Sequence, residues 1–207
     1  MLKTCLLNLE NRFDYILRRT QLEILKPLNP FDVSLLLRAV EFAAVKHRDQ
    51  RRKGVDALPY INHPIKVASM IANIGGVHSL PTLLAAILHD TIEDTCTTRE
   101  EIEALVGPDV LSIVLEVTDD KKLPKSDRKR LQIEHAQQKS LDAKLVKLAD
   151  KCANIIDVCE NPPADWSSER RMEYLDWAEK VVDGCRDTNK ALEAYFDQTL
   201  KEAKKKL

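Results

Sequence analysis

Apolar residues recur along this chain at the three- and four-residue spacing of amphipathic helices, and alternating runs typical of strands hardly occur. The chain has only 5 Gly, and aromatic residues make up 5% of it, which also disfavours a β-rich fold. The pattern therefore predicts an all-α fold. Helices are expected over residues 32–50, 64–73, 80–90, 98–106, 108–118, 126–139, 141–159, 168–183 and 186–203. In the first of them the predicted core positions are Val33, Leu36, Leu37, Val40 and Ala44.

Proline, glycine and capping residues mark the expected helix ends. Pro64 is suited to the first position of a helix, and Gly75-Gly76 is suited to ending it. Thr98 and Glu101 have the spacing of a capping box, which predicts a short helix that Gly107-Pro108 stops.

A chain of 207 residues is long enough for one domain with a substantial core. Residues 1–30 are predicted to be an N-terminal extension, partly helical around 5–25. Residues 31–200 are predicted to form the domain, and 201–207 a frayed, solvated basic tail.

Composition narrows the class of protein. Hydrophobic residues make up 44% and charged residues 31%, as in soluble proteins, and the net charge of -1 gives no global field for nucleic acid. No apolar run approaches the roughly 18 residues that a membrane span needs. The five cysteines include no C-x-x-C pair, which predicts free thiols and a cytoplasmic location.

The segment 87–94 concentrates titratable groups at the end of an apolar run. His89 and Asp90 are each followed four residues later by an acid, Glu93 and Asp94, so in a helix each pair shares a face. Burying such groups unpaired costs several kcal/mol each, which favours a divalent metal among them. The alternative is a solvated helix end with acids there by chance.

His63 and Asp150 complete this group as an N/O ligand set without thiolate. It suits Mn²⁺, Fe or Zn²⁺, with positions left for water and substrate. Glu93 and Asp94 then exceed the needs of one ion and are interpreted as groups that orient, deprotonate or protonate near a metal-bound water. Taken singly, His63 can be a loop histidine and Asp150 a helix-surface acid.

Two basic runs, 46–53 and 121–130, are either solvated faces or receivers of a small polyphosphate. Such runs are more often solvated faces than sites, but two of them beside an acidic metal centre would suit a small polyphosphate.

Five blocks of the sequence carry a family resemblance in addition to the His, His-Asp, Asp spacing. They are Lys46–Lys53, Pro59–Pro64, Ala86–Thr95, Val117–Lys121 and Ala143–Lys151. Over roughly residues 35–195 the chain resembles the hydrolase domain of the RelA/SpoT family, within the HD phosphohydrolase superfamily. It is most similar to the stand-alone animal form.

The resemblance implies a helical HD domain that binds one metal ion, usually Mn²⁺, with Zn²⁺ or Fe as substitutes. Its ligands would be His63, His89, Asp90 and Asp150, and the catalytic pair that activates water would be Glu93 and Asp94. Residues matching the family's substrate pocket are Arg52, Lys53, Lys125, Asn154, Arg170 and Tyr174. Trp166 and Trp177 are expected to be core residues.

The chain departs from the family pattern at Cys152-Ala153, where relatives carry a bulkier pair ending in Tyr, in the compact loop 54–59 and in residues 1–30. The difference beside Asn154 bears on nucleotide preference. His47, His78 and His135 have no matching metal role and are expected to be structural or surface residues.

The implied activity is Mn²⁺-dependent hydrolysis of the 3′-pyrophosphate of guanosine 3′,5′-bis(diphosphate), ppGpp. The domain would degrade this nucleotide and not make it, since no synthetase half follows. Two alternatives stay open: an NADPH 2′-phosphatase using the same site, and a non-catalytic nucleotide-binding module. A helical interaction protein without a site would require the five-block resemblance to be accidental. The expected partner is a small nucleotide, neither nucleic acid nor membrane, and the oligomeric state is left open.

Overall fold

The computed structural model describes residues 29–207, so the helix expected around residues 5–25 lies outside the described residues. Within 29–207 the regular structure is helical, and the β-bridge between Arg51 and Pro59 is isolated. The all-α prediction is confirmed.

The helices follow one another with short connections, and residues 34–207 form one compact unit. They are α2 (Pro30–Lys46), α3 (Asn62–Asn73), α4 (Leu80–Leu88), α5 (Thr91–Asp94), α6 (Arg99–Val106), α7 (Pro108–Val117), α8 (Lys125–Ala136), α9 (Leu141–Glu160), α10 (Ser168–Asp183) and α11 (Lys190–Lys206). None of these described helices is both long and apolar enough to cross a membrane.

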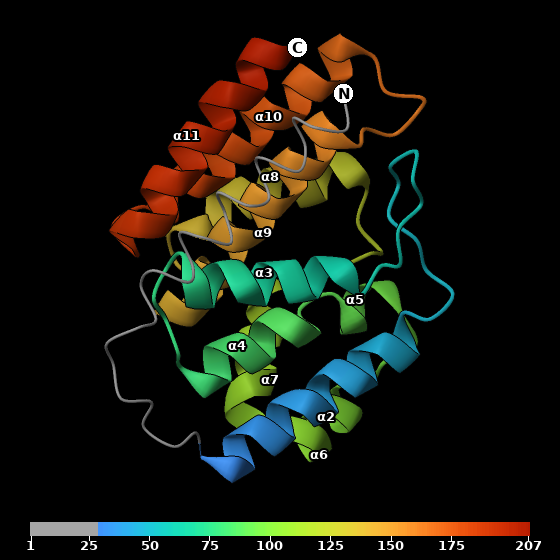
Figure 1. Cartoon of the computed structure of the whole chain (residues 1–207), viewed down its shortest axis with the longest axis vertical. Coiled ribbons are helices and arrows are strands. Elements are labelled where there is room, and N and C mark those ends of the chain that lie inside the picture. The colour runs from blue at the N-terminus through green and yellow to red at the C-terminus, as the bar shows by residue number, and fades with distance from the viewer. Residues whose placement is uncertain (1–28) are drawn as a thin grey trace, which may run out of the picture. The chain divides into compact units, whose positions relative to one another are not determined.

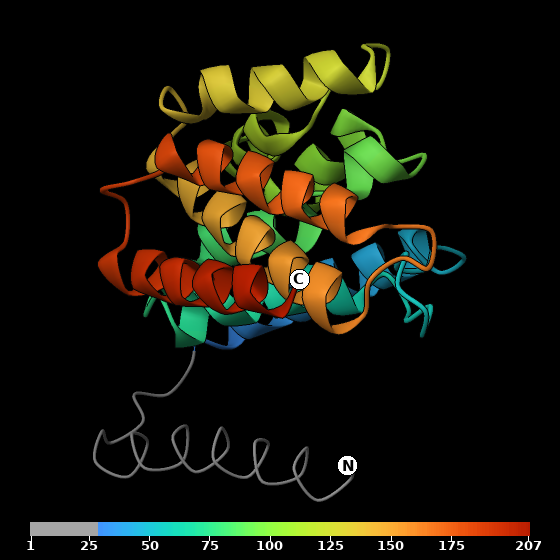
Figure 2. The ribbon, with the colours of Figure 1, turned by 90° about the horizontal axis from the view of Figure 1, so that it is seen from above.

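Helix α9 is central to the packing. It lies between α3 on one side and α10 and α11 on the other (Figure 1), and it also contacts α4 and α7. Helix α8 packs along α10 on the side away from α11 (Figure 2). Every residue from 145 to 153 is buried, so α9 is buried on all of its faces. Because Lys147, Asp150 and Lys151 lie in this stretch, their charges must find partners inside the protein.

Capping side chains define several helix starts. The Thr98 hydroxyl accepts from the backbone N–H of Glu101, and the Glu101 carboxylate accepts from the N–H of Thr98, which confirms the predicted capping box. Gly107 then separates α6 from α7 with a φ of 87°, in the region that favours glycine. Side-chain caps also begin α9, α10 and α11, at Ser140, Ser167 and Asn189.

The predicted core face of α2 is wrong at Leu37, and the helix ends at Lys46 and not at residue 50. Ala39 and Ala43 are fully buried, whereas Leu37 is 63% exposed. The other predicted core positions, Val33, Leu36, Val40 and Ala44, are partly buried. Small residues let the helix lie close to its neighbours, so the buried face is set by alanines and not by the largest apolar side chains.

The helix predicted over 80–90 is interrupted at the chemically important residues. Helix α4 ends at Leu88, His89 and Asp90 form a turn, and α5 is a single helical turn. The Thr91 hydroxyl donates to the Leu88 carbonyl at 2.7 Å, which satisfies one of the oxygens left at the end of α4. The backbone N–H of Asp94 still donates to the Asp90 carbonyl at 2.8 Å.

Two further boundaries differ from the predictions. Helix α3 begins at Asn62, so Pro64 is its third residue, still within the first turn that tolerates proline. The frayed basic tail is wrong, because α11 continues to Lys206 and Ala203 is buried. Lys204 holds this last part of α11 against α10 through ion pairs with Asp176 at 2.9 Å and Glu179 at 2.7 Å.

Replacing Leu192 with Ala should lower the free energy of unfolding by about 2–5 kcal/mol, because this α11 side chain is fully buried and its loss leaves a cavity. The matched control Leu37→Ala should change it by less than about 0.5 kcal/mol. Urea denaturation followed by circular dichroism measures both. A large loss at Leu37 would contradict the register of α2.

Candidate functional site

The four predicted metal ligands converge from three parts of the fold. His63 comes from the first turn of α3, His89 and Asp90 from the turn between α4 and α5, and Asp150 from the middle of α9. The His63 Nε2 atom lies 3.1 Å from Asp150 Oδ1 and 3.7 Å from Asp90 Oδ2. The His89 Nε2 atom lies 3.0 Å from Asp90 Oδ2 and 3.9 Å from Asp150 Oδ1.

The two imidazoles present nitrogen atoms toward this centre. His89 Nδ1 contacts the Ala86 carbonyl at 2.8 Å, and since a carbonyl only accepts, Nδ1 carries the proton. Its Nε2 is then free to face the carboxylates. Burial opposes a charged His89, but the Asp90 carboxylate outweighs it and raises the His89 pKa to about 9. Burial is the main cause that lowers the pKa of His63.

This donor set fits a divalent metal ion. His63, His89 and Asp90 each offer a ligand atom, and these atoms all lie within 4.8 Å of one another. Asp150 adds a carboxylate oxygen beside both imidazoles. Two imidazole nitrogens and two carboxylates without thiolate suit a first-row divalent ion. The carboxylates of Asp90 and Asp150 beside the two imidazoles are negative charges that such a cation would offset.

Side chains that the sequence reasoning missed hold the two carboxylates. The Tyr60 hydroxyl donates to Asp90 Oδ2 at 2.7 Å, and burial together with Asp90 raises the pKa of Tyr60, so it stays a donor. Lys151 Nζ donates to Asp150 Oδ2 at 2.9 Å. Burial opposes the charge of Lys151, but Asp150 outweighs it and raises the lysine pKa. The one available signal was position: Lys151 is adjacent to Asp150 within an apolar helix.

Glu93 and Asp94 lie on α5, directly after the turn formed by His89 and Asp90, and each lies close to a positively charged side chain. Glu93 Oε2 accepts from the backbone N–H of Asp119 at 3.0 Å, and Glu93 Oε1 lies 3.6 Å from Arg128. Burial is the main cause that raises the pKa of Glu93. Asp94 forms an ion pair with Lys121.

Neither Arg128 nor Lys121 was singled out from the sequence, although both lie in the basic run 121–130. Asp94 also accepts a hydrogen bond from the side chain of Gln50. This residue lies in the other basic run, 46–53, and was also missed.

Arg52 and Asn154 are brought together beside Asp150. Arg52 Nη2 donates to Asn154 Oδ1 at 2.6 Å and to Asp157 Oδ2 at 2.7 Å. Asn154 Nδ2 in turn donates to Asp150 Oδ1 at 2.5 Å. The Arg52 guanidinium also lies over the Tyr60 ring, 5.4 Å from its centroid. Asn154 thus contacts the predicted metal ligand Asp150 directly, and Arg52 reaches it through Asn154.

Tyr174 lies in a row of aromatic rings with Trp166 and Trp177, with ring centroids 5.7 and 5.3 Å away. The Arg170 guanidinium lies over Trp166 at 4.6 Å. Burial raises the pKa of Tyr174 to about 12. Trp177 packs against the core cluster, as predicted. The prediction is wrong for Trp166, which lies outside that cluster and packs against the Arg170 guanidinium.

Two lysines lie over Trp177, and one of them, Lys151, also contacts the predicted metal ligand Asp150. Lys129 Nζ is 4.8 Å and Lys151 Nζ 4.6 Å from the Trp177 ring centroid. Burial and the neighbouring Lys125 charge lower the pKa of Lys129. Lys125 is the exposed first residue of α8, and Lys53 is likewise exposed. Neither side chain forms an ion pair or hydrogen bond with another described residue.

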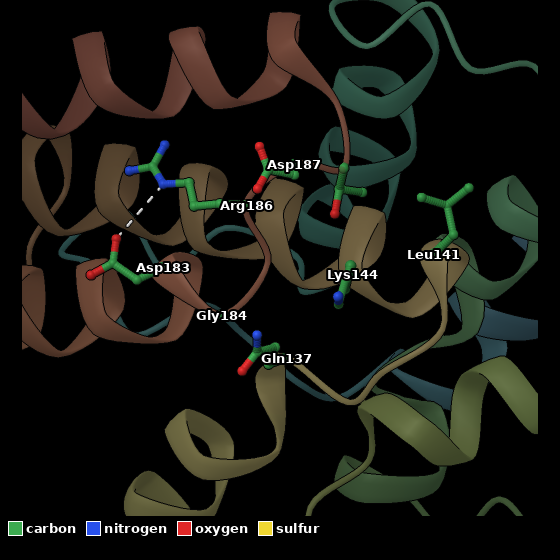
Figure 3. Close-up of a pocket in the computed structure, with 8 residues that line it drawn as sticks. Gln137, Leu141, Lys144, Asp183, Gly184, Arg186 and Asp187 are labelled. Atoms are coloured by element: carbon green, nitrogen blue, oxygen red, sulfur yellow. Dashed lines mark ion pairs between the residues drawn. The ribbon is translucent and has the colours of Figure 1, made fainter.

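A separate polar pocket lies where α8 ends, α9 begins and α10 ends (Figure 3). It contains none of the predicted site residues. Its guanidinium, Arg186, is already paired with Asp183 at 3.7 Å and with Asp197 at 2.7 Å. That pairing leaves Arg186 poorly suited to receive an anionic ligand.

Comparisons with known proteins identify the family of this chain. The family model of the HD domain matches residues 39–175. The chain is 54% identical over 166 residues to guanosine-3′,5′-bis(diphosphate) 3′-pyrophosphohydrolase MESH1 of Xenopus tropicalis, covering 80% of this chain and 93% of the relative. It is 49% identical over 171 residues to the protein of the same name from Homo sapiens, covering 83% and 96%.

A solved structure agrees in fold as well as sequence. It is of a protein described as a metazoan orthologue of SpoT that hydrolyses ppGpp. It shares 46% identity with a TM-score of 0.79 and covers 81% of this chain and 94% of that one. The chain therefore belongs to the HD-domain family and, within it, to the group of the animal MESH1 proteins.

Proposed function

We propose that this protein hydrolyses the 3′-pyrophosphate of ppGpp to GDP and pyrophosphate, with Mn²⁺ as its metal. The observation that carries the proposal is the high identity, over nearly whole chains, to relatives named for this reaction. The convergence of His63, His89, Asp90 and Asp150 on one buried centre supports the metal dependence.

The reaction breaks the bond between the ribose 3′ oxygen and phosphorus. A water oxygen forms the new bond to phosphorus, and a proton must leave the water while another reaches the 3′ oxygen. His63, His89, Asp90 and Asp150 would hold the divalent ion, which would supply Lewis-acid chemistry: it would lower the pKa of a water and offset charge on phosphoryl oxygens.

The chain's own residues prepare the proton transfer. Burial raises the pKa of Glu93, which brings this carboxylate closer to the neutral range, where a general base or acid works well. The Asp119 backbone N–H and Arg128 limit the orientations of Glu93. Asp94, paired with Lys121, supplies a second carboxylate on the same turn. We assign the proton transfers to this pair.

The remaining cations suit the phosphates and the base. Exposed Lys125 and Lys53 are free to meet phosphate oxygens. The Arg170 guanidinium lies over Trp166, which is next to Tyr174, and a purine can stack on this guanidinium. Arg52, held between Asn154 and Asp157, would contact the nucleotide from a fixed position. The cytoplasmic location stays a prediction.

Purified protein with Mn²⁺ should release pyrophosphate from ppGpp, and the product should be GDP. Asp90→Ala should abolish the release because it removes a predicted ligand, and EDTA should do the same until Mn²⁺ is added back. NADPH offered in parallel separates the two phosphohydrolase activities. Preferential release of inorganic phosphate from NADPH would replace the proposed substrate, and no turnover of either with metal bound would contradict a hydrolase for both.

Glu93→Gln and Asp94→Asn should each lower kcat by about 10²- to 10⁴-fold with a small change in KM, because each removes a proton-transfer group. Metal content, measured by elemental analysis, should stay at the wild-type level. Glu103→Gln, an exposed carboxylate on α6, is the matched control. Loss of activity in parallel with loss of metal would instead make Glu93 or Asp94 a metal-holding group.

Lys125→Ala should raise KM for ppGpp by roughly 10-fold or more with kcat changed little, since a charged hydrogen bond to phosphate is worth about 1.5–3 kcal/mol. The effect should shrink as salt is added. Lys201→Ala, at an exposed position of α11, is the control. An equal rise in KM for Lys201→Ala would contradict a specific phosphate contact, because the loss of any positive charge would then explain the effect of Lys125→Ala.

A further inference from the structure

Gln50 connects the loop after α2 to the proposed catalytic residue Asp94. Its side-chain Nε2 donates to Asp94 Oδ2 at 3.2 Å, and its Oε1 lies 2.7 Å from His47 Nδ1. The backbone of Gln50 is fixed as well: its N–H donates to the His47 carbonyl at 2.9 Å, and its carbonyl accepts from the N–H of Tyr60 at 3.1 Å. The Gln50 side chain therefore extends from a hydrogen-bonded backbone, and its amide contacts Asp94.

The direction of each hydrogen bond in this chain follows from donor and acceptor chemistry. A carboxylate only accepts, so Gln50 must turn its NH₂ toward Asp94 and its oxygen toward His47. That oxygen also only accepts, so His47 must carry its proton on Nδ1. The other nitrogen, His47 Nε2, is buried and has no hydrogen-bond partner among the described residues. The Nδ1–H form of His47 thus selects one orientation of the Gln50 amide.

His47 is itself held firmly. It is only 2% exposed, and its ring stacks on Tyr60 with centroids 4.7 Å apart and planes at 26°. The same Tyr60 donates its hydroxyl to Asp90. One imidazole therefore supports a proposed metal ligand through Tyr60 and a proposed catalytic carboxylate through Gln50.

The second donor to Asp94 is less rigid. Lys121 pairs with the other oxygen, Oδ1, but its side chain is 49% exposed and reaches Asp94 over four flexible carbons. Exposed pairs of this kind fix geometry weakly. Gln50 is held through its backbone and its side-chain oxygen, so of the two donors it restricts the orientation of the Asp94 carboxylate more.

We propose that Gln50 is a positioning residue for Asp94 and that His47 fixes the orientation of its amide. The proposal rests on the proposed function of Asp94 in hydrolysis. Reactions that depend on a fixed geometry lose about 10²-fold for a displacement of 1 Å. Removing the Gln50 donor should therefore lower kcat while the metal and the substrate still bind.

The kinetic test uses Gln50→Met, which keeps length without the donor, and His47→Phe, which keeps the ring that stacks on Tyr60. Both should lower kcat roughly 10- to 100-fold, with KM within about 2-fold of wild type and unchanged metal content. His47→Asn, which keeps a donor near the position of Nδ1, should recover part of that loss. Gln138→Met, an exposed glutamine after α8, is the matched control and should behave as wild type.

A double variant distinguishes positioning from general damage to the fold. In the Asp94→Asn background, Gln50→Met should lower kcat no further, because its effect passes through the Asp94 carboxylate. A full additional loss in the double variant would overturn the proposal. Wild-type kcat in Gln50→Met, with Asp94→Asn impaired, would overturn it as well.

A spectroscopic measurement keeps the proposal separate from the choice of substrate. Long-range ¹H–¹⁵N correlation spectra of the full chain, loaded with diamagnetic Zn²⁺, should show the proton of His47 on Nδ1, and Gln50→Met should remove that preference. A proton on Nε2 in the wild type would overturn the inference even if ppGpp were hydrolysed. If ppGpp were not hydrolysed but the Nδ1–H form were present, the proposed function would fail and the orientation of Gln50 would stand.

Discussion

The pairing of Asp150 with Lys151 inside α9 is the interaction on which the site depends. This helix is surrounded by others and buried on all faces through residues 145–153, an environment in which an isolated carboxylate is strongly disfavoured. The adjacent ammonium and the imidazole of His63 hold the pKa of Asp150 well below its usual value, against the effect of burial. The Asp150 carboxylate can thus stay charged in the core. There it lies close to His63 of α3 and to His89 of the turn between α4 and α5.

The fold and the site could be predicted from the sequence where the signal was local. Helix periodicity, the capping box at Thr98 and the unusual apolar setting of Asp150 depend on residues a few positions apart. The buried face of α2 could not be predicted, because it depends on which neighbour the helix meets. The partners Tyr60, Gln50 and Lys121 could not be predicted either, since they lie 30, 44 and 27 residues from the acids they contact.

The described site has two parts with different physical character. The groups around His63, Asp90 and Asp150 are buried or partly buried and hydrogen-bonded to one another, which restricts their movement. Lys53 and Lys125 are exposed and keep their rotamer freedom. A fixed centre suits the bond-breaking step, which demands precise geometry, and adaptable cations suit the capture of flexible phosphate chains.

The row formed by Trp166, Tyr174 and Trp177 has a consequence for optical measurements. The chain contains 2 tryptophans, and both lie in this row, with Arg170 over one indole and Lys129 and Lys151 over the other. Intrinsic tryptophan fluorescence from this protein therefore originates entirely from this row of rings, next to the proposed metal centre. When the indole band is excited at its red edge, the tryptophan fluorescence of the unlabelled protein therefore reports changes around Trp166 and Trp177.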